Sequence, residues 1–283
     1  MNVTNFDVRL VPGESARYPV FMAELLASGL RWLHHTRGSN VFLVEADDGR
    51  LALVDTGFGS STAAILEELS AHEEPLSMIL LTHGHRDHSG AAAGVRAATG
   101  ARVALGRGDC LEQAAGLVLH PTLGRTHPLR KLTSRTRQPH EDTSIDLPLD
   151  DEVEVLPGIR AVPVAGHTPG AYCFVVERLG AAFVGDLVIS HSGELTRSMK
   201  WANSDDQQYL QSIRDFGAVA PEIGLPGHGT PVMAGFGDAL RELGELPRRS
   251  GFRYSFERAR RLFHFSKGIT TPRAPSNRPN HDA

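Results

Sequence analysis

Four residues of types that bind metal ions follow directly after one apolar run of this chain. The run SMILLT, Ser77–Thr82, has the composition of a buried strand, and the residues after it include His83, His85, Asp87 and His88 within THGHRDHSG. Residues two apart in an extended segment point the same way, so His83 and His85 can reach one point in space. Asp87 and His88 follow where the chain turns toward the next helix, and they can reach a second point nearby. Packing gives no reason to place such side chains there, because burying them unpaired is costly.

Three further residues of the same types lie downstream, each just after a predicted strand and beside glycine. They are His167 in AGHTPG, Asp186 in FVGD and His228 in LPGHG. In a layered α/β protein, binding sites collect at the ends of strands. Five histidines and two aspartates are sufficient for two metal ions, and these ligand types suit zinc, iron and manganese alike. The sequence therefore predicts a metal centre and leaves the metal open.

Short apolar runs alternate with helical patterns along the chain, which predicts an α/β sandwich. The predicted strands, which are rich in Val, Ile or Leu, are Val8–Val11, Asn40–Glu45, Leu51–Asp55, Met78–Thr82, Val103–Leu105, Ala161–Val164, Tyr172–Val176, Ala182–Gly185 and Glu222–Leu225. The predicted helices are Ser61–Ser70, Gly90–Thr99 with Ser89 as its cap, and Asp205–Phe216 with polar capping residues at its start.

Three segments do not fit this alternation. Residues 106–147 mix Gly, Pro and basic residues, and we interpret them as an irregular insertion that forms either a solvated face or a lid near the site. Residues 267–283 are rich in Pro, Arg and Asn, which predicts a disordered tail. Phe21–Leu33 has apolar residues at near-helical spacing, and we expect it to pack on the sandwich, cap a pocket or form a homodimer contact.

Composition excludes several classes of protein. The 283 residues are 41% hydrophobic and carry a formal charge of -4, which is unlike a dedicated nucleic-acid binder. No apolar run approaches the ~18 residues of a membrane-spanning helix, and the first residues do not have the pattern of a secretory signal. The two cysteines are too few for a disulfide framework or a Cys-rich zinc site. We therefore expect a cytoplasmic protein with a small-molecule substrate and neither a nucleic-acid nor a membrane partner.

In chain order, THGHRDHSG, GHTPG, VGD and PGHG resemble the motifs of the metallo-β-lactamase-fold superfamily. VDTG at Val54–Gly57 resembles the early strand-turn element of that superfamily. The resemblance covers roughly Asn40 to Thr230. It implies an α/β fold, an αββα sandwich of the metallo-β-lactamase type, with a dinuclear metal site at one edge. We expect a single domain of this kind over residues 1–266.

The resemblance also implies a role for each motif residue. It implies that His83, His85 and His167 bind one metal ion and that Asp87, His88 and His228 bind the other. Asp186 would bridge the two ions. Asp55 would bond a ligand or nearby backbone, although a turn-forming Asp beside Gly is an equally good interpretation.

Asp186 narrows the class of enzyme that we expect. True β-lactamases of the superfamily usually lack an Asp at this position, whereas glyoxalase II, lactonases, phosphotriesterase-like members and other esterases carry it. The sequence after it, DLVISHSGELTR, matches neither the glutathione-binding stretch of glyoxalase II nor the Tyr of lactonases. The first polar ring there is His191. We name His191 and Tyr209 as candidate substrate contacts.

The resemblance, together with the seven candidate ligands, implies a hydrolase with two Zn²⁺ ions, with Fe or Mn as alternative metals. A hydroxide shared by the two ions would attack an ester, thioester or lactone bond, and Asp87 would take a proton during turnover. Three other functions stay open: a phosphotriester or phosphodiester hydrolase, an iron-dependent enzyme similar to persulfide dioxygenases, and a binding module without activity. The full set of seven ligands argues against the last two.

Overall fold

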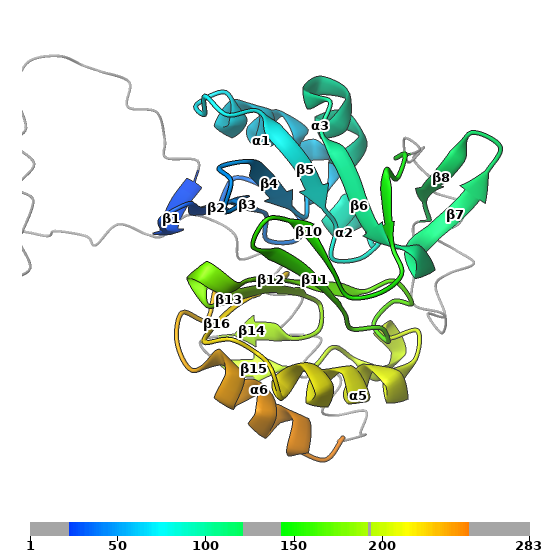
Figure 1. Ribbon diagram of the computed structural model, residues 1–283. Helices are drawn as coiled ribbons and strands as arrows, with labels where there is room; N and C mark the ends of the chain where they lie inside the picture. Colours follow the sequence, from blue (N-terminus) through cyan, green and yellow to red (C-terminus); the bar gives the residue numbers. More distant parts are fainter. Residues whose placement is uncertain (1–22, 121–142, 192–193, 249–283) are drawn as a thin grey trace, which may run out of the picture.

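The computed structural model describes residues 23–120, 143–191 and 194–248, and it shows two β-sheets packed face to face (Figure 1). The first sheet has seven strands in the order β1-β2-β3-β4-β5-β6-β9. Their bounds are Ala23–Ala27, Leu30–Leu33, Phe42–Glu45, Leu51–Val54, Leu76–Leu80, Arg102–Gly106 and Leu147–Leu149. The second sheet has the order β10-β11-β12-β13-β16, with bounds Val153–Leu156, Ile159–Pro163, Tyr172–Val176, Ala181–Gly185 and Ile223–Pro226.

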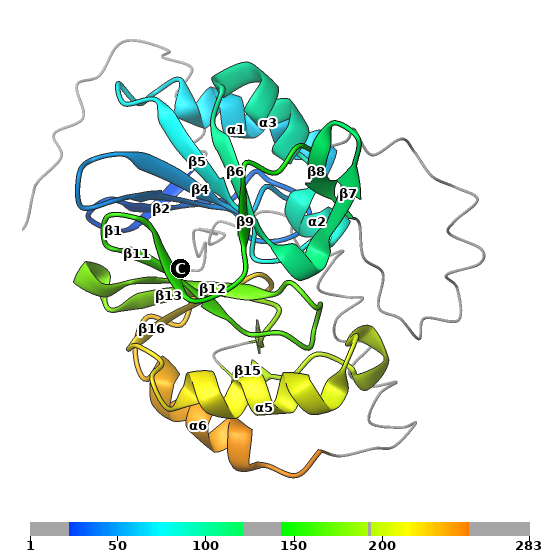
Figure 2. The ribbon, with the colours of Figure 1, turned by 45° about the vertical axis from the view of Figure 1, so that its right-hand side comes forward.

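Helices cover the outer face of each sheet (Figure 2). Helices α1 (Thr62–Leu69) and α3 (Ala92–Thr99) lie on the seven-stranded sheet, and α5 (Asp206–Gly217) and α6 (Phe236–Glu245) lie on the five-stranded sheet. The shorter elements are η1 (Gly59–Ser61), α2 (Arg86–Ser89), η2 (Arg107–Asp109), η3 (Glu177–Leu179), η4 (Lys200–Ala202) and the hairpins β7–β8 (Cys110–Gln113, Gly116–Leu119) and β14–β15 (Ile189–His191, Glu194–Thr196). This arrangement confirms the predicted αββα sandwich.

Three apolar clusters fill the three gaps between these four layers. The cluster between the sheets includes Phe42 and Phe183, whose ring centroids lie 5.3 Å apart. A second cluster packs α1 and α3 on the first sheet, and a third packs α5 and α6 on the second. Strand β4 shows why its sequence, LALV, is apolar throughout: Leu53 faces the helices and Val54 faces the other sheet. A strand covered on both faces has no polar side.

The predicted strands within the described residues all correspond to observed strands, with ends that differ by two residues or fewer. The predicted helices correspond to α1, α3 and α5 in the same way. The strand predicted at Val8–Val11 and the tail predicted at 267–283 lie outside the described residues. One detail was wrong: Ser89 does not cap α3, because it ends α2 and its hydroxyl donates to the His85 carbonyl at 2.9 Å. Ala91 occupies the N-cap position of α3 instead.

The helical interpretation of Phe21–Leu33 was also wrong. Its described part is the antiparallel hairpin β1–β2, which turns at Gly29 with a φ of 73°. Strand β2 also pairs with β3, so the backbone of this segment is bonded as part of a sheet. Leu30 is fully buried between the sheets, which means that the segment packs on the sandwich. A homodimer contact there stays a prediction.

The segment predicted as an irregular insertion is partly regular. Strand β6 ends at Gly106, and η2 and the β7–β8 hairpin follow it before the chain returns as β9. Residues 121–142 of this segment lie outside the described part, so the predicted lid stays a prediction. Within the ranges that the structure describes, each helix is too short or too polar to cross a bilayer.

Candidate metal centre

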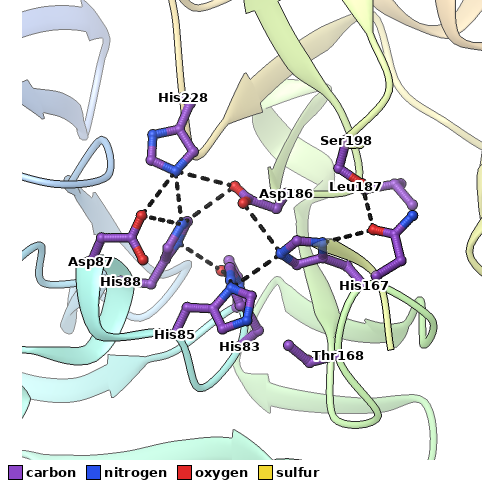
Figure 3. A network of polar contacts seen from close by, with 12 residues as sticks. His83, His85, Asp87, His88, His167, Thr168, Asp186, Leu187, Ser198 and His228 are labelled. Atoms are coloured by element: carbon purple, nitrogen blue, oxygen red, sulfur yellow. Dashed lines mark hydrogen bonds and ion pairs between the residues drawn. The ribbon is translucent and has the colours of Figure 1, made fainter. Parts of the chain in front are cut away.

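The seven predicted ligands come together at one edge of the sandwich (Figure 3). Both sheets contribute, and each ligand follows a strand: the THGHRDHSG motif follows β5, and single ligands follow β11, β13 and β16. The ligand atoms form two groups, each with all of its atoms within 4.8 Å of one another. The groups are His83, His85, His167 and Asp186, and Asp87, His88 and His228.

The first group contains three imidazole rings whose nitrogens face one another, together with the carboxylate of Asp186. His83 Nε2 lies 2.9 Å from His85 Nδ1, and His167 Nε2 lies 3.1 Å from the same atom. Burial lowers the pKa of His85 to about 3, with the neighbouring His167 acting in the same direction. Burial also holds the pKa of His83 well below its ordinary value. These histidines are therefore neutral, which is the form that binds metals.

The second group combines two histidines with a carboxylate. His228 Nε2 lies 3.2 Å from both His88 Nε2 and Asp87 Oδ2. Asp186 connects the two groups: its Oδ2 lies 3.3 Å from His167 Nε2, and its Oδ1 lies 3.3 Å from His88 Nε2. One carboxylate therefore turns an oxygen toward each group, as expected of a residue that bridges two ions.

Negative charge is concentrated around the second group. Burial opposes protonation of His88, but the carboxylates of Asp55 and Asp186 raise its pKa well above the ordinary value. Burial alone would raise the pKa of Asp186, yet His228 and His88 hold it well below its usual range. Such a cluster of buried carboxylates attracts positive charge, either a proton on imidazole or a divalent cation.

The donors fit a metal ion in two respects. Nitrogens that bind one zinc ion tetrahedrally at about 2.0–2.1 Å lie about 3.3 Å apart, and the nitrogen pairs here lie 2.9–3.2 Å apart. Asp186 Oδ1 is buried and has no hydrogen-bond partner within the described part of the chain. A buried carboxylate oxygen without a hydrogen bond is costly, and coordination of a cation would satisfy it.

Asp55 supports one histidine of each group. Its Oδ2 accepts a hydrogen bond from His88 Nδ1 at 2.8 Å, which leaves Nε2 of His88 as the nitrogen that faces the other donors. Thr82 donates its hydroxyl to Asp55 Oδ2 at 2.8 Å and lies 3.1 Å from His83 Nδ1. Asp55 itself has a φ of 56°, a conformation that is rare outside glycine. The VDTG turn therefore places the Asp55 carboxylate behind one histidine of each donor group.

His167 is supported by a neutral amide. Asn203 donates its Nδ2 to Asp206 Oδ1 at 2.7 Å, which turns its Oδ1 toward His167 Nδ1 at 3.0 Å. The amide oxygen can only accept, so His167 carries its proton on Nδ1 and presents Nε2 to the centre. Arg248 in turn bonds both oxygens of Asp206. A four-residue chain thus fixes the orientation of one ligand.

The two candidate substrate contacts lie outside this donor cluster. Tyr209 is fully buried: its hydroxyl donates to the Leu187 carbonyl at 2.7 Å and accepts from Ser198 N at 2.8 Å. That position belongs to the scaffold and is not open to a substrate. His191 ends β14, pairs with Glu194 in the hairpin and is exposed. Its contact with substrate stays a prediction.

Sequence reasoning missed Thr82 and Asn203. Thr82 precedes His83 directly, and a hydroxyl beside a candidate ligand was a usable signal. Asn203 lies 36 residues after His167 and has no motif around it. Its role depends on a loop contact, which no local pattern encodes.

Known proteins share this architecture, and a family model matches the part of the chain that holds the candidate site. The family model described as "Metallo-beta-lactamase superfamily" matches residues 36–228, which include all seven candidate ligands. Among solved structures, a metallo-beta-lactamase family protein from Thermus thermophilus superposes with a TM-score of 0.54 at 21% identity. The match covers 84% of this chain and 82% of that one.

Two curated relatives carry the word thioesterase in their names. The atrochrysone carboxyl ACP thioesterase of Aspergillus fumigatus is 28% identical over 200 residues, which is 69% of this chain and 52% of the relative. The thioesterase pkgB of Emericella nidulans is 25% identical over 202 residues, or 70% and 47%. The chain therefore spans about half the length of these relatives. With the family match covering its whole site, the chain belongs to the metallo-beta-lactamase superfamily.

Proposed function

We propose that the protein is a metal-dependent hydrolase that cleaves thioesters. The observation that carries the proposal is the set of seven donors in two groups joined by Asp186. The thioesterase names of two relatives favour a thioester over the ester and lactone bonds that the sequence left open. A thioester suits such a centre because its carbonyl can be attacked without a Ser or Cys nucleophile.

The proposal assigns one cation to each group of donors. His83, His85 and His167 would hold one ion, Asp87, His88 and His228 the other, and Asp186 both. We propose zinc, with iron or manganese as alternatives, because these ligand types do not select among the three. A pair of such cations lowers the pKa of coordinated water and polarises a carbonyl oxygen.

The residues of the chain have separate tasks in this proposal. Asp55 and Asn203 keep the protons of His88 and His167 on Nδ1, so that the Nε2 atoms face the centre. Asp87 is the carboxylate of the site with the more exposed side chain, at 32% against 11% for Asp186. A carboxylate that binds through one oxygen keeps the other for a proton, so we assign proton transfer to Asp87.

The test combines metal content with release of a thiol. Protein purified without added metal is analysed for bound elements and then incubated with acyl-N-acetylcysteamine and acyl-coenzyme A thioesters, while a thiol reagent records the product. We expect about two zinc or similar ions per chain and turnover that chelation abolishes and added metal restores. Full metal loading without thiol release from either substrate would contradict the proposal.

The same experiment separates the main alternative. An enzyme similar to persulfide dioxygenases would hold one iron per chain and consume oxygen in the presence of a persulfide. One bound iron and oxygen uptake would therefore move the assignment to sulfur oxidation. A protein that takes up no metal on titration would leave only the binding module.

A further inference from the structure

Asp109 is a buried carboxylate that belongs to neither group of donors. It ends η2, directly after strand β6 of the seven-stranded sheet, and it is 0% exposed. A buried Asp needs several hydrogen bonds to offset the loss of water. Within the described residues, the hydrogen-bond partners of its carboxylate all lie in loops that carry candidate metal-binding histidines.

Both oxygens of Asp109 accept hydrogen bonds from these loops. Its Oδ2 accepts from the backbone N–H of Gly84, between His83 and His85, at 2.7 Å. The same oxygen accepts from the Thr168 hydroxyl at 2.6 Å, and Oδ1 accepts from the Gly170 N–H at 3.0 Å. Thr168 and Gly170 follow His167 in the loop between β11 and β12, so one side chain holds both loops.

The backbones around Asp109 pack too closely for other residues. A Cβ on Gly170 would lie 2.5 Å from the Asp109 nitrogen, and a Cβ on Gly84 would lie 3.2 Å from the Asp109 Cβ. The glycine between the two histidines thus allows close approach of Asp109. Contact this close leaves the two loops little freedom to shift independently.

We propose that Asp109 is a positioning residue that fixes the loop of His83 and His85 to the loop of His167, and thereby sets the spacing of the first donor group. The proposal rests on the proposed metal centre. It explains why a carboxylate is used, since an amide has one acceptor oxygen and cannot accept from Gly84 and Gly170 together. The two loops follow strands of different sheets. Without Asp109, only the packing of the two sheets against each other would set the distance between these histidines.

Two variants remove the hydrogen bonds between Asp109 and the two loops to different extents. Asp109→Asn keeps the size of the side chain but loses at least one of the two backbone bonds. Thr168→Val removes a single hydroxyl and leaves a side chain of the same shape. The matched control is Asp146→Asn, because Asp146 also bonds a backbone N–H, that of Val103 at 2.9 Å, but at the opposite end of β6.

Two measurements on the full chain test the proposal. The first is zinc affinity by competition with a chromophoric chelator, and the second is amide hydrogen exchange of peptides that cover residues 82–90 and 165–172 in metal-free protein. Loss of a group behind a ligand typically weakens binding about 10–100-fold, and we expect Asp109→Asn to fall in this range, with Thr168→Val several-fold. Both variants should speed exchange in both peptides, and Asp146→Asn should change neither quantity more than about twofold.

The outcomes are distinct. Unchanged exchange in either peptide of Asp109→Asn would show that Asp109 does not join the two loops. Faster exchange with unchanged zinc affinity would show that joining the loops does not affect the donor group. If Asp109→Asn does not fold, Thr168→Val decides both points. If the unmodified protein binds no zinc, the proposed function fails, and the exchange measurement still decides whether Asp109 joins the loops.

Discussion

The two sheets support their candidate metal ligands in different ways. On the seven-stranded sheet, the charged carboxylate of Asp55 lies behind His88 directly and behind His83 through Thr82. On the five-stranded sheet, the neutral amide of Asn203 lies behind His167. A carboxylate raises the basicity of the histidine that it bonds, whereas an amide mainly fixes the ring orientation and tautomer.

This difference matches the charges around each group. Besides Asp55, His88 lies near the carboxylates of Asp87 and Asp186, so its anionic partner continues a network that already favours positive charge. His167 lies beside the neutral histidines His83 and His85 and near the carboxylate of Asp186, and here the chain provides a neutral partner. His88 and His167 thus have supports of different polarity, and substitutions can separate charge from orientation.

The largest effect is expected at Asp186, which belongs to both groups. Asp186→Asn keeps one oxygen and can therefore serve only one group. We expect loss of one of two bound ions and a decrease in thioester hydrolysis beyond the roughly 10–100-fold typical of groups behind the ligands. Metal content per chain and thiol release measure this, with the exposed helical Asp215→Asn as the control. Two ions bound with unchanged affinity would show that Asp186 does not join the groups.

Asp55→Asn should have the next largest effect. Asn tolerates the positive φ at this position, so the substitution changes charge with little strain. Removing one partner of a buried pair costs about 3–5 kcal/mol, so the metal-free protein should lose that much free energy of unfolding in urea. Metal affinity should fall about 10–100-fold. Asp48→Asn, at an exposed position, is the control. Equal metal affinities for the two variants would show that Asp55 does not support the metal centre.

The sequence predicted what is local and missed what depends on contacts between loops. The strands and the seven candidate ligands after them could be predicted, because these residue types follow apolar runs and most of them lie beside glycine. That they bind metal stays a prediction. The β1–β2 hairpin was not, because Leu25, Leu26 and Leu30 fit helical spacing until the pairing with β3 decides the structure. Asn203 and Asp109 were missed because each meets its ligand loops only after both sheets are in place.

Asn203→Leu tests the support that the neutral Asn203 amide gives to His167. Leu removes the acceptor for His167 Nδ1 and leaves Ser198 and Asp206 without their amide partner. We expect zinc affinity to fall about 10-fold, the low end of the range for such groups. Ser198→Ala is the matched control, because it removes a neighbour of the amide and keeps the bond to His167. A decrease as large as that of Asp55→Asn would mean that charge behind the ligand does not matter.

The smallest effect is expected where a carboxylate supports no ligand. The hydrogen bond from Arg96, and that from the Val103 N–H, lower the pKa of Asp146 in the folded protein. A lowered pKa means that this carboxylate stabilises the fold above its unfolded pKa of about 3.9 and that the stabilisation disappears as the pH falls through the folded pKa. Asp146→Asn should therefore cost roughly 0.2–1 kcal/mol at pH 7 and nothing in strong acid. Urea unfolding of both proteins over this pH range measures the difference, and a deficit that stays constant with pH would assign it to lost hydrogen-bond geometry instead of charge.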